Sequence, residues 1–278
     1  MIAPLKLIAA SETFAGRRRT TVSSVILFSK LWQKRDSRKA VSDTMRLSIL
    51  LVFILLISGV SFAEEAYPDE VQASQDSVSG KPKNVKIDTT ASADYLTEIE
   101  RQIIIEINLV RANPSQYARM FLVPLRSYYH NGLLQYPGEI AISTHEGIRA
   151  LNACIKVLQV AKPLPPLYPK KGLTLAARDH AKDQAKTGAT GHIGSDGSTP
   201  KTRLNRYGKW GISAGENIGY GYGEAKGIVA SLLIDDGMPS RGHRKNLLSD
   251  SFQFVGVAVG THPVYRYLCV MEFAVSYR

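Results

Sequence analysis

Cysteine is scarce in this chain, whose 278 residues include only Cys154 and Cys269. Two thiols cannot form a cysteine cluster, so a metal site built from cysteines is excluded. An even count permits one disulfide in an exported protein. Both residues also lie on apolar stretches, where buried free thiols are common. The sequence therefore leaves a Cys154–Cys269 bridge and two free thiols as open alternatives.

Several motifs of nucleotide and catalytic sites are missing as well. The stretch Tyr220–Gly223 lacks the Gly-Lys-Ser/Thr of a phosphate-binding loop, and no His-Glu-x-x-His pair is present. Ser195 lies near His192 and Ser213 near Glu216, but neither resembles a nucleophile elbow or a catalytic triad. The sequence therefore assigns no catalytic residue and no nucleotide cofactor.

The apolar stretch from Leu47 to Val60 is shorter than the roughly 20 residues that a membrane-spanning helix needs. It follows Met45-Arg46 and is followed by Ser61-Phe62-Ala63. A positive start, an apolar core and small residues before a cut are typical of a secretory signal peptide. We therefore expect residues 45–63 to be a signal peptide cleaved after Ala63. The protein would then be secreted to an extracellular or periplasmic space, with the membrane involved only through this signal.

Residues 1–44 are an unusually long extension ahead of such a signal. Our preferred interpretation is that Met45 is the true start and that residues 1–44 are unstructured. In the alternative, the basic prefix stays in the cytoplasm and the apolar stretch becomes an uncleaved anchor. N-terminal sequencing of the mature protein separates the two, because cleavage predicts a start near Glu64.

The formal net charge of +11 comes mostly from the N-terminus, since residues 1–46 hold 10 of the 35 Lys and Arg but 3 of the 24 acids. From residue 64 onward, 25 basic and 21 acidic residues leave 25 − 21 = +4. So small an excess does not indicate a nucleic-acid partner.

Residues 64–93 are rich in Ser, Asp, Lys, Pro and Gly and have no apolar period, so we expect a disordered linker. The domain then spans residues 94–278. Apolar residues three and four apart predict helices over 96–113, from His145 to Pro163, and over 173–186 and 224–234. Ser143 and Glu146 have the spacing of a capping box for the second of these, and Thr199-Pro200 predicts a short helix to Gly208.

Strand periods come last in the chain. Residues alternate in polarity from Tyr265 to Val275, and residues 252–260 are rich in Val and Phe, so a hairpin joins them at 261–264. Helices first and antiparallel strands last indicate an α+β fold rather than a doubly wound sheet.

Three glycine-flanked motifs carry the functional information. Each places an imidazole or carboxylate beside glycine, which favours tight turns that aim a side chain into a cleft. The motifs are Gly191–Gly197, Ala214–Ile218 and Ser240–Arg244.

With these motifs, residues 96–278 resemble a CAP domain, the superfamily of cysteine-rich secretory, antigen 5 and pathogenesis-related class 1 proteins, and in particular its bacterial SCP-like branch. Several ordered motifs in one register are more specific than any single one. The matching segments are Asn108–Pro114, Ala176–His180, the motifs of His192 and Glu216, and Ser240–Leu248. The resemblance implies a three-layer α-β-α sandwich with an antiparallel central sheet.

The resemblance also implies a cleft lined by two His and two acidic residues. His192 and His243 match the two histidines, and Glu216 matches the first acid. The family's second Glu corresponds best to Asp235, whose side chain is one methylene shorter. The set of four ligands, His192, Glu216, Asp235 and His243, is then effectively three if Asp235 falls short.

Two imidazoles with one or two carboxylates can hold Zn²⁺ or another divalent metal. We therefore expect an exported CAP-domain protein whose cleft binds a metal and a small ligand or extracellular partner. One alternative is a metal-assisted extracytoplasmic hydrolase of peptide or ester bonds, with Glu216 as general base. Another is a lipid- or sterol-binding carrier.

Other polar residues receive plainer interpretations. His180 lies in register with an apolar helical stripe, so we expect a hydrogen-bonded packing histidine. His130, His145 and His262 fall in or near loops and are expected to be solvated. Arg241 and Arg244 flank His243, where they can pair with the acids of the cleft.

Overall fold

The computed structural model describes residues 5–6, 9–15, 87–135 and 141–278, with side chains only in the last two ranges. The chain divides into two units, residues 1–18 with 83–278 and residues 19–82. The second unit lies outside the described residues. The predicted signal peptide 45–63, its cut after Ala63 and residues 64–86 of the predicted linker also lie outside the described residues.

A mixed five-stranded sheet forms the centre of the domain, in the order β2-β7-β9-β8-β6. The long strands β7, β9 and β8 pair antiparallel, β2 pairs antiparallel with β7, and the short β6 pairs parallel with β8. The strands are β2 (Ala9–Ala15), β6 (Tyr168–Pro169), β7 (Trp210–Tyr220), β8 (Phe254–His262) and β9 (Arg266–Tyr277). The predicted hairpin is thus confirmed, with its turn at residues 263–265.

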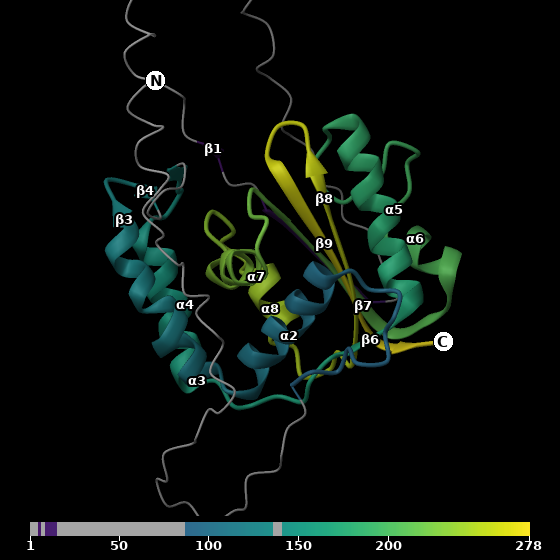
Figure 1. Cartoon of the computed structure of the whole chain (residues 1–278), viewed down its shortest axis with the longest axis horizontal. Coiled ribbons are helices and arrows are strands. Elements are labelled where there is room, and N and C mark those ends of the chain that lie inside the picture. Colours follow the sequence, from purple (N-terminus) through teal and green to yellow (C-terminus); the bar gives the residue numbers. More distant parts are fainter. Residues whose placement is uncertain (1–4, 7–8, 16–86, 136–140) are drawn as a thin grey trace, which may run out of the picture. The chain divides into compact units, whose positions relative to one another are not determined.

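Helices cover both faces of this sheet (Figure 1). On one face lie α5 (Lys171–Thr187) and α6 (Pro200–Tyr207), with α5 packed on β8 and β9. The other face carries α2 (Glu98–Ala112), α7 (Ala225–Ile234) and α8 (Gly242–Leu247), and α4 (Ile148–Val160) packs against α7 on the side away from the sheet (Figure 1). The α+β class and the three-layer α-β-α sandwich are therefore confirmed.

Short elements connect α2 to α4. They are α3 (Pro114–Tyr117), a π-helical turn η1 (Ala118–Leu122), a 3₁₀ turn η2 (Pro124–Tyr128), and the strands β3 (Tyr129–His130), β4 (Leu133–Leu134) and β5 (Ile142–Ser143). With β1 (Leu5–Lys6), these three strands form a second, small sheet in the order β1-β5-β4-β3. Asn113 ends α2, as the Asn-Pro step predicts, and its side chain caps α3.

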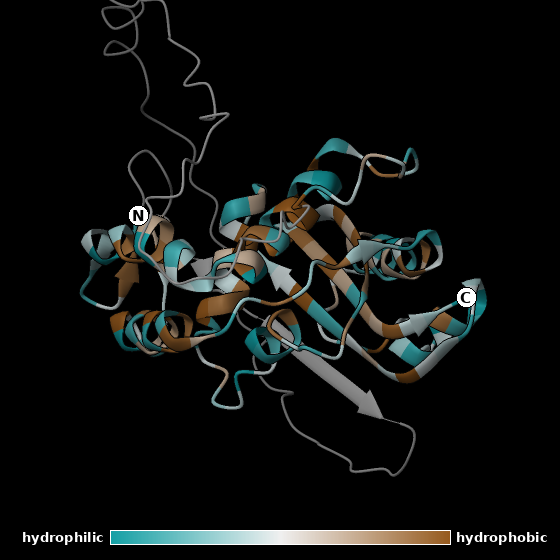
Figure 2. Cartoon of the chain, turned by 90° about the horizontal axis from the view of Figure 1, so that it is seen from below, coloured by the Kyte–Doolittle hydropathy of each residue, from teal (hydrophilic) through white to brown (hydrophobic). Residues whose placement is uncertain are grey.

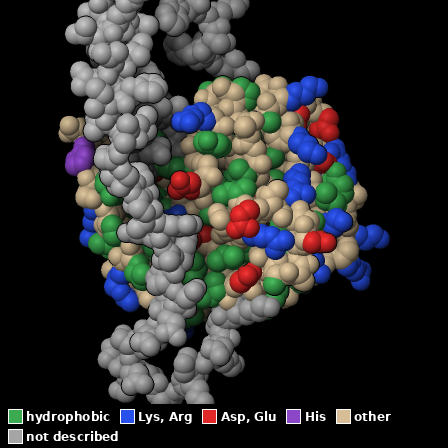
Figure 3. Space-filling model, viewed as in Figure 1, with side chains coloured by type: hydrophobic (Ala, Val, Ile, Leu, Met, Phe, Trp, Pro, Cys, Tyr) green, Lys and Arg blue, Asp and Glu red, His purple; other side chains and the backbone are tan. Residues whose placement is uncertain are grey.

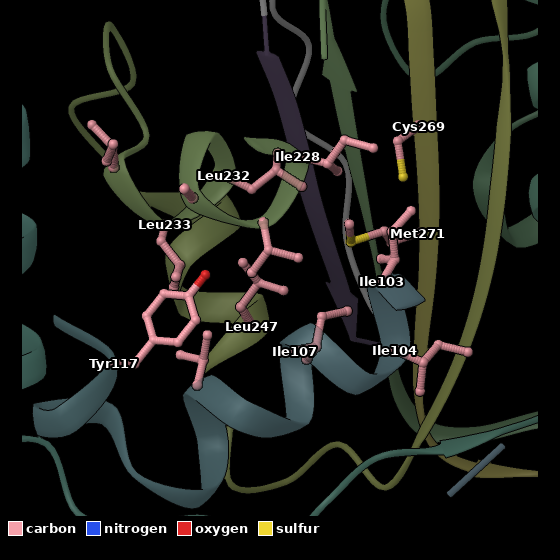
Figure 4. Packing of buried hydrophobic residues seen from close by; sticks show 14 of the residues in the cluster. Ile103, Ile104, Ile107, Tyr117, Ile228, Leu232, Leu233, Leu247, Cys269 and Met271 are labelled. Carbon is pink, nitrogen blue, oxygen red and sulfur yellow. The ribbon is translucent and has the colours of Figure 1, made fainter. Parts of the chain in front are cut away.

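Hydrophobic residues gather along the strands and on the helix faces that meet them (Figure 2). The largest cluster lies between the sheet and α2, α4, α7 and α8. Figure 4 shows Ile103 and Ile107 of α2 close to Leu247 of α8, with Met271 and Cys269 from β9 beside them. Two smaller clusters bury the opposite face under α5 and α6. Both faces of β9 are buried. Successive side chains of this strand therefore enter the hydrophobic clusters on alternate faces of the sheet, rather than alternating between the core and the solvent.

The two cysteines are buried and free. Cys154 lies on α4 and Cys269 on β9, both in the largest cluster. Burial raises the pKa of the Cys154 thiol to about 11 and that of the Cys269 thiol further. Of the two alternatives that the sequence leaves open, the structure has free thiols.

The capping box predicted at Ser143 and Glu146 is wrong. Helix α4 begins at Ile148, and its N-cap Gly147 has φ 60° and makes no side-chain cap. Ser143 belongs to β5, and the Glu146 carboxylate accepts hydrogen bonds from Arg241 and Gly237 instead. A capping box does occur at α2, between Thr97 and Glu100.

Two N-terminal segments have more structure than the sequence predicts. Residues 9–15, within the extension 1–44 that we expected to be unstructured, form β2. Residues 87–93, the end of the predicted disordered linker, lie against α2. There the Thr89 hydroxyl donates to the Leu167 carbonyl at 2.7 Å, and the Asn108 amide donates to Ile87 at 2.9 Å. Buried acceptors therefore fix a segment whose composition alone indicates solvation.

Acidic and basic side chains are mixed with other types on the face that Figure 3 presents. Among the described residues, no helix combines the length and the apolar character needed to cross a bilayer.

Candidate functional site

His192, Glu216 and Arg203 come together from three segments. His192 lies in the loop between α5 and α6, Arg203 on α6 and Glu216 on β7. The His192 Nδ1 atom is 2.7 Å from Glu216 Oε1, and Arg203 Nη2 donates to Glu216 Oε2 at 2.7 Å. The side chains of Glu216 and Arg203 are buried, at 0% and 1% exposure. Both carboxylate oxygens of Glu216 are thus engaged by cationic or N–H donors.

Burial of Glu216 raises its pKa, because desolvation disfavours the charged form. The hydrogen bond to His192 and the charge of Arg203 outweigh burial, so the pKa of this carboxyl is lowered below its usual range. Glu216 is therefore an ionised carboxylate at neutral pH. Since a carboxylate only accepts hydrogen bonds, the neutral His192 ring carries its proton on Nδ1 and leaves the Nε2 lone pair available.

Arg203 and Glu272 are members of this group that the sequence did not identify. Glu272 lies opposite Glu216 in the register of β7 and β9 and is fully buried. A glutamate inside the otherwise apolar run Leu268–Ala274 is an anomaly that could have identified it. Arg203 shares a buried helix face with Pro200 and Leu204, a position where charge is equally anomalous.

The loop that carries His192 is held by buried polar side chains. His180 Nε2 and Gln184 Nε2 donate to the Gly191 carbonyl at 2.8 Å and 2.7 Å, and the Gly191 N–H donates to the Tyr220 hydroxyl. His180 is completely buried, which confirms the packing role predicted for it. These bonds hold the backbone next to His192.

His262 corrects another expectation, because it is buried rather than solvated. Its Nε2 atom lies 3.2 Å from the carbonyl of Ala189, in the loop that carries His192. Its Nδ1 accepts hydrogen bonds from the backbone N–H groups of Val264 and Tyr265. The hairpin turn thus folds this imidazole inward. His130 and His145 are exposed, as predicted.

Asp235 and His243 form a second pair within a short stretch of chain. Asp235 follows α7 in the left-handed conformation, with φ 59° and ψ 45°, and His243 is the second residue of α8. His243 Nδ1 is 2.5 Å from Asp235 Oδ1, while the backbone N–H groups of His243 and Arg244 donate to Oδ2 at 3.0 Å and 3.2 Å. Both side chains are completely buried. Asp235 therefore reaches His243 and also satisfies the first turn of α8.

Arg241 and Arg244 do not pair with the carboxylates of the candidate site. Arg244 donates from Nε to the Leu233 carbonyl and from Nη2 to that of Ile234. Arg241 donates to the Asp235 carbonyl and forms an ion pair with Glu146. Both guanidinium groups thus satisfy the carbonyls at the end of α7 and support the loop that holds Asp235.

Strand β7 relates the two pairs to each other. Glu216 and Asn217 are neighbours on this strand, so their side chains point to opposite faces of the sheet. Glu216 faces the layer of α5 and α6, where it meets His192. Asn217 faces α8, where its amide donates to the His243 carbonyl at 3.1 Å and accepts from Asn246 at 2.8 Å. The two histidines therefore attach to adjacent residues of β7 from its two faces.

Each histidine retains one ring nitrogen that is not used in these pairs. The Nε2 atoms of His192 and His243 are buried and have no hydrogen-bond partner within the part of the chain that the structure describes. An imidazole whose Nδ1–H is held by a carboxylate and whose Nε2 is unbonded has the arrangement of a metal-ligating histidine. However, no group of three or more His, Cys, Asp or Glu in the described ranges is placed to hold a metal ion. The donor types fit a divalent metal, with the carboxylates behind the imidazoles rather than beside them.

Other residues of the sequence motifs act structurally. Arg111 is buried and donates to the carbonyls of Pro165, Leu247 and Ser249, which ties α2 to the segment after α8. Burial lowers its pKa to about 10. Ser195 donates its hydroxyl to Asp183 rather than to His192. Neither residue provides a catalytic nucleophile or base.

A groove of about 710 Å³ lies beside the end of α8. Seven of its ten lining residues are polar or charged, and they are Ser213, Lys245, Asn246, Ser249, Asp250, Ser251 and Gln253. The other three are Ile212, Phe252 and Val275.

Nearly half of the chain resembles a known protein family. Residues 142–274 match the model of the cysteine-rich secretory protein family, CAP. No curated protein sequence matches the chain.

Solved structures of three bacterial proteins are similar to part of the chain. An extracellular protein containing a SCP domain from Bacillus anthracis is 28% identical, over 40% of this chain and 34% of its own, with a TM-score of 0.34. An outer surface protein from Borrelia burgdorferi is 20% identical over 40% and 78%, with a TM-score of 0.33. A cysteine-rich secretory protein from Staphylococcus aureus is 16% identical over 46% and 37%, with a TM-score of 0.30. The chain thus spans about a third of the length of the first and third of these proteins.

Proposed function

We propose that this chain, whose residues 142–274 match the model of the CAP family, is an exported CAP-domain protein in which His192 and His243 bind a divalent metal ion such as Zn²⁺. Glu216 and Asp235 hold the two imidazoles and add negative charge behind them. The ion then provides a point of attachment for a small ligand or an extracellular partner.

The observation that carries this proposal is the pair of unbonded Nε2 atoms. A buried imidazole nitrogen without a partner is costly, because it has lost its bond to water. Two such nitrogens, each behind an Nδ1 bond to a carboxylate, are accounted for if both coordinate a metal. Zn²⁺ suits this donor set, since it takes neutral imidazole nitrogen readily.

A hydrolase with Glu216 as general base has less support. A general base needs a free lone pair near the water that it deprotonates and a pKa close to the working pH. Both oxygens of Glu216 are engaged, and its pKa is lowered. A role as the partner that orients His192 agrees better with this geometry.

Isothermal titration calorimetry of the full chain with Zn²⁺ tests the proposal. We expect stoichiometric binding by the unaltered protein and none by the double variant His192→Ala/His243→Ala. The matched control removes two exposed imidazoles, with His130→Ala/His145→Ala, and should bind zinc like the unaltered chain. Circular dichroism checks that both variants are folded. Equal zinc binding by the two double variants would show that His192 and His243 are not the ligands.

A further inference from the structure

The outer edge of β7 is occupied by residues from the far N-terminus of the chain. Strand β2 pairs antiparallel with β7 through seven residue pairs, from Ala9 opposite Gly219 to Ala15 opposite Ser213. The other edge of β7 pairs with β9. Without β2, therefore, β7 would be an edge strand of the large sheet and would present a row of unpaired N–H and C=O groups.

Both histidines also contact β7, at the neighbouring residues Glu216 and Asn217. His192 meets Glu216 on one face of β7, and His243 meets Asn217 on the other. Any contact between the two faces that does not cross the sheet must pass around the outer edge of β7. Strand β2 runs along that edge, with the backbone of Glu12 opposite Glu216, and it also lies against α8, which carries His243.

We propose that the β7 edge is a docking surface for an extended strand, that residues 9–15 are its occupant, and that this strand weakens the joint binding of one metal ion by the two histidines. The part concerning a shared ligand rests on the proposed metal function. Pairing through main-chain hydrogen bonds is the means by which a sheet edge accepts an added strand.

Hydrogen exchange of the full chain tests the pairing. The variant Ser11→Pro/Glu12→Pro disrupts β2, because successive N–H groups point to opposite sides of a strand and one of the two prolines must remove a donor toward β7. We expect every second amide between Ser213 and Gly219 to exchange at least about 10-fold faster, since those amides lose their partners while the amides that face β9 keep theirs. The matched control is Ser23→Pro/Ser24→Pro, outside the described residues. The same exchange pattern in both variants would overturn the proposal.

Titration with Zn²⁺ tests the consequence for the histidines. If β2 weakens their joint binding of one ion, Ser11→Pro/Glu12→Pro should bind zinc at least about 10-fold more tightly than the unaltered chain and the control variant. Faster exchange with unchanged zinc affinity would overturn the weakening role of β2. Faster exchange with no zinc binding by any variant would support β2 as the occupant of the edge, but would overturn the metal function and the role of β2 that rests on it.

Discussion

The Glu216–His192 pair is assembled from distant segments, whereas the Asp235–His243 pair is built within residues 235–244. In the first pair, Arg203 and His192 balance the buried carboxylate, and they come from α6 and from the loop before it. In the second, two backbone N–H groups of α8 and the His243 ring surround the carboxylate. Both arrangements leave a histidine Nε2 buried without a hydrogen-bond partner among the described residues.

The difference shows that one geometry of imidazole and carboxylate can rest on two kinds of support. A side-chain cation can be removed by a single substitution, and the charge of Glu216 would then be poorly compensated. A backbone N–H cannot be removed without proline, so the support of Asp235 is more resistant to substitution of its neighbours. The two pairs should therefore respond unequally to mutation.

The largest effect is expected when Arg203 is replaced by Met. The substitution leaves Glu216 buried without its full-charge partner, so we expect the free energy of unfolding to fall by about 3–5 kcal/mol. Chemical denaturation of the full chain measures this change. Arg206→Met on the same helix is the matched control, because its partners Asp179 and Asp196 lie at the surface, where the loss of an ion pair changes stability little. Similar losses for the two variants would contradict the role given to Arg203.

A smaller effect is expected at Asp235. Asp235→Ala removes three hydrogen bonds and leaves an alanine in the left-handed conformation, so we expect a loss of about 2–3 kcal/mol by chemical denaturation. Asp235→Asn keeps an oxygen acceptor in a residue that tolerates this backbone conformation, and it should lose about half as much. If Asn cost more than Ala, the charge of Asp235 rather than its bonds to α8 would be its main contribution.

Most of the fold could be predicted from the sequence, because its periods are strong and local. The period of apolar residues gives α2 and α5, the Thr199-Pro200 step gives α6, and Gly188 with φ 69° ends α5 as predicted. The start of α4 could not be predicted in the same way. Glu146 lies at the spacing of a capping box, but the distant Arg241 binds it, and no local pattern reveals such a partner.

The arrangement of the candidate site could not be predicted from the sequence. His192, Glu216 and His243 could be identified in glycine-flanked motifs and Asp235 through the resemblance to the CAP family, and their binding of a metal stays a prediction. Arg203 could not be identified, because an arginine on a helix is usually solvated, and only the folded chain shows that this one is buried against Glu216. The positions of the two histidines on opposite faces of β7 could not be predicted either, because they depend on how distant segments pack on this strand.

The smallest effect is expected from the pH dependence of His180, which belongs to the support of the Glu216–His192 pair. Burial lowers the pKa of His180, and the nearby charges of Glu216 and Arg203 act on it in opposite directions. In the unfolded chain a histidine titrates near pH 6.5. The folded state therefore binds its proton only at lower pH, and the stability that the neutral ring contributes is present above about pH 6.5 and is lost as the pH falls below that value.

One group contributes at most about 1.4 kcal/mol per pH unit to this slope. We expect His180→Gln, whose amide can still donate to the Gly191 carbonyl, to flatten the fall in unfolding free energy below pH 6.5 relative to the unaltered chain. Urea denaturation at pH 7.5, 6.5 and 5.5 measures both slopes. The control is His145→Gln, an exposed imidazole that should leave the slope unchanged. Equal slopes for His180→Gln and the unaltered chain would contradict this prediction. The stability of the Glu216–His192 pair would then not depend on pH through His180, and pH would not distinguish it from the Asp235–His243 pair.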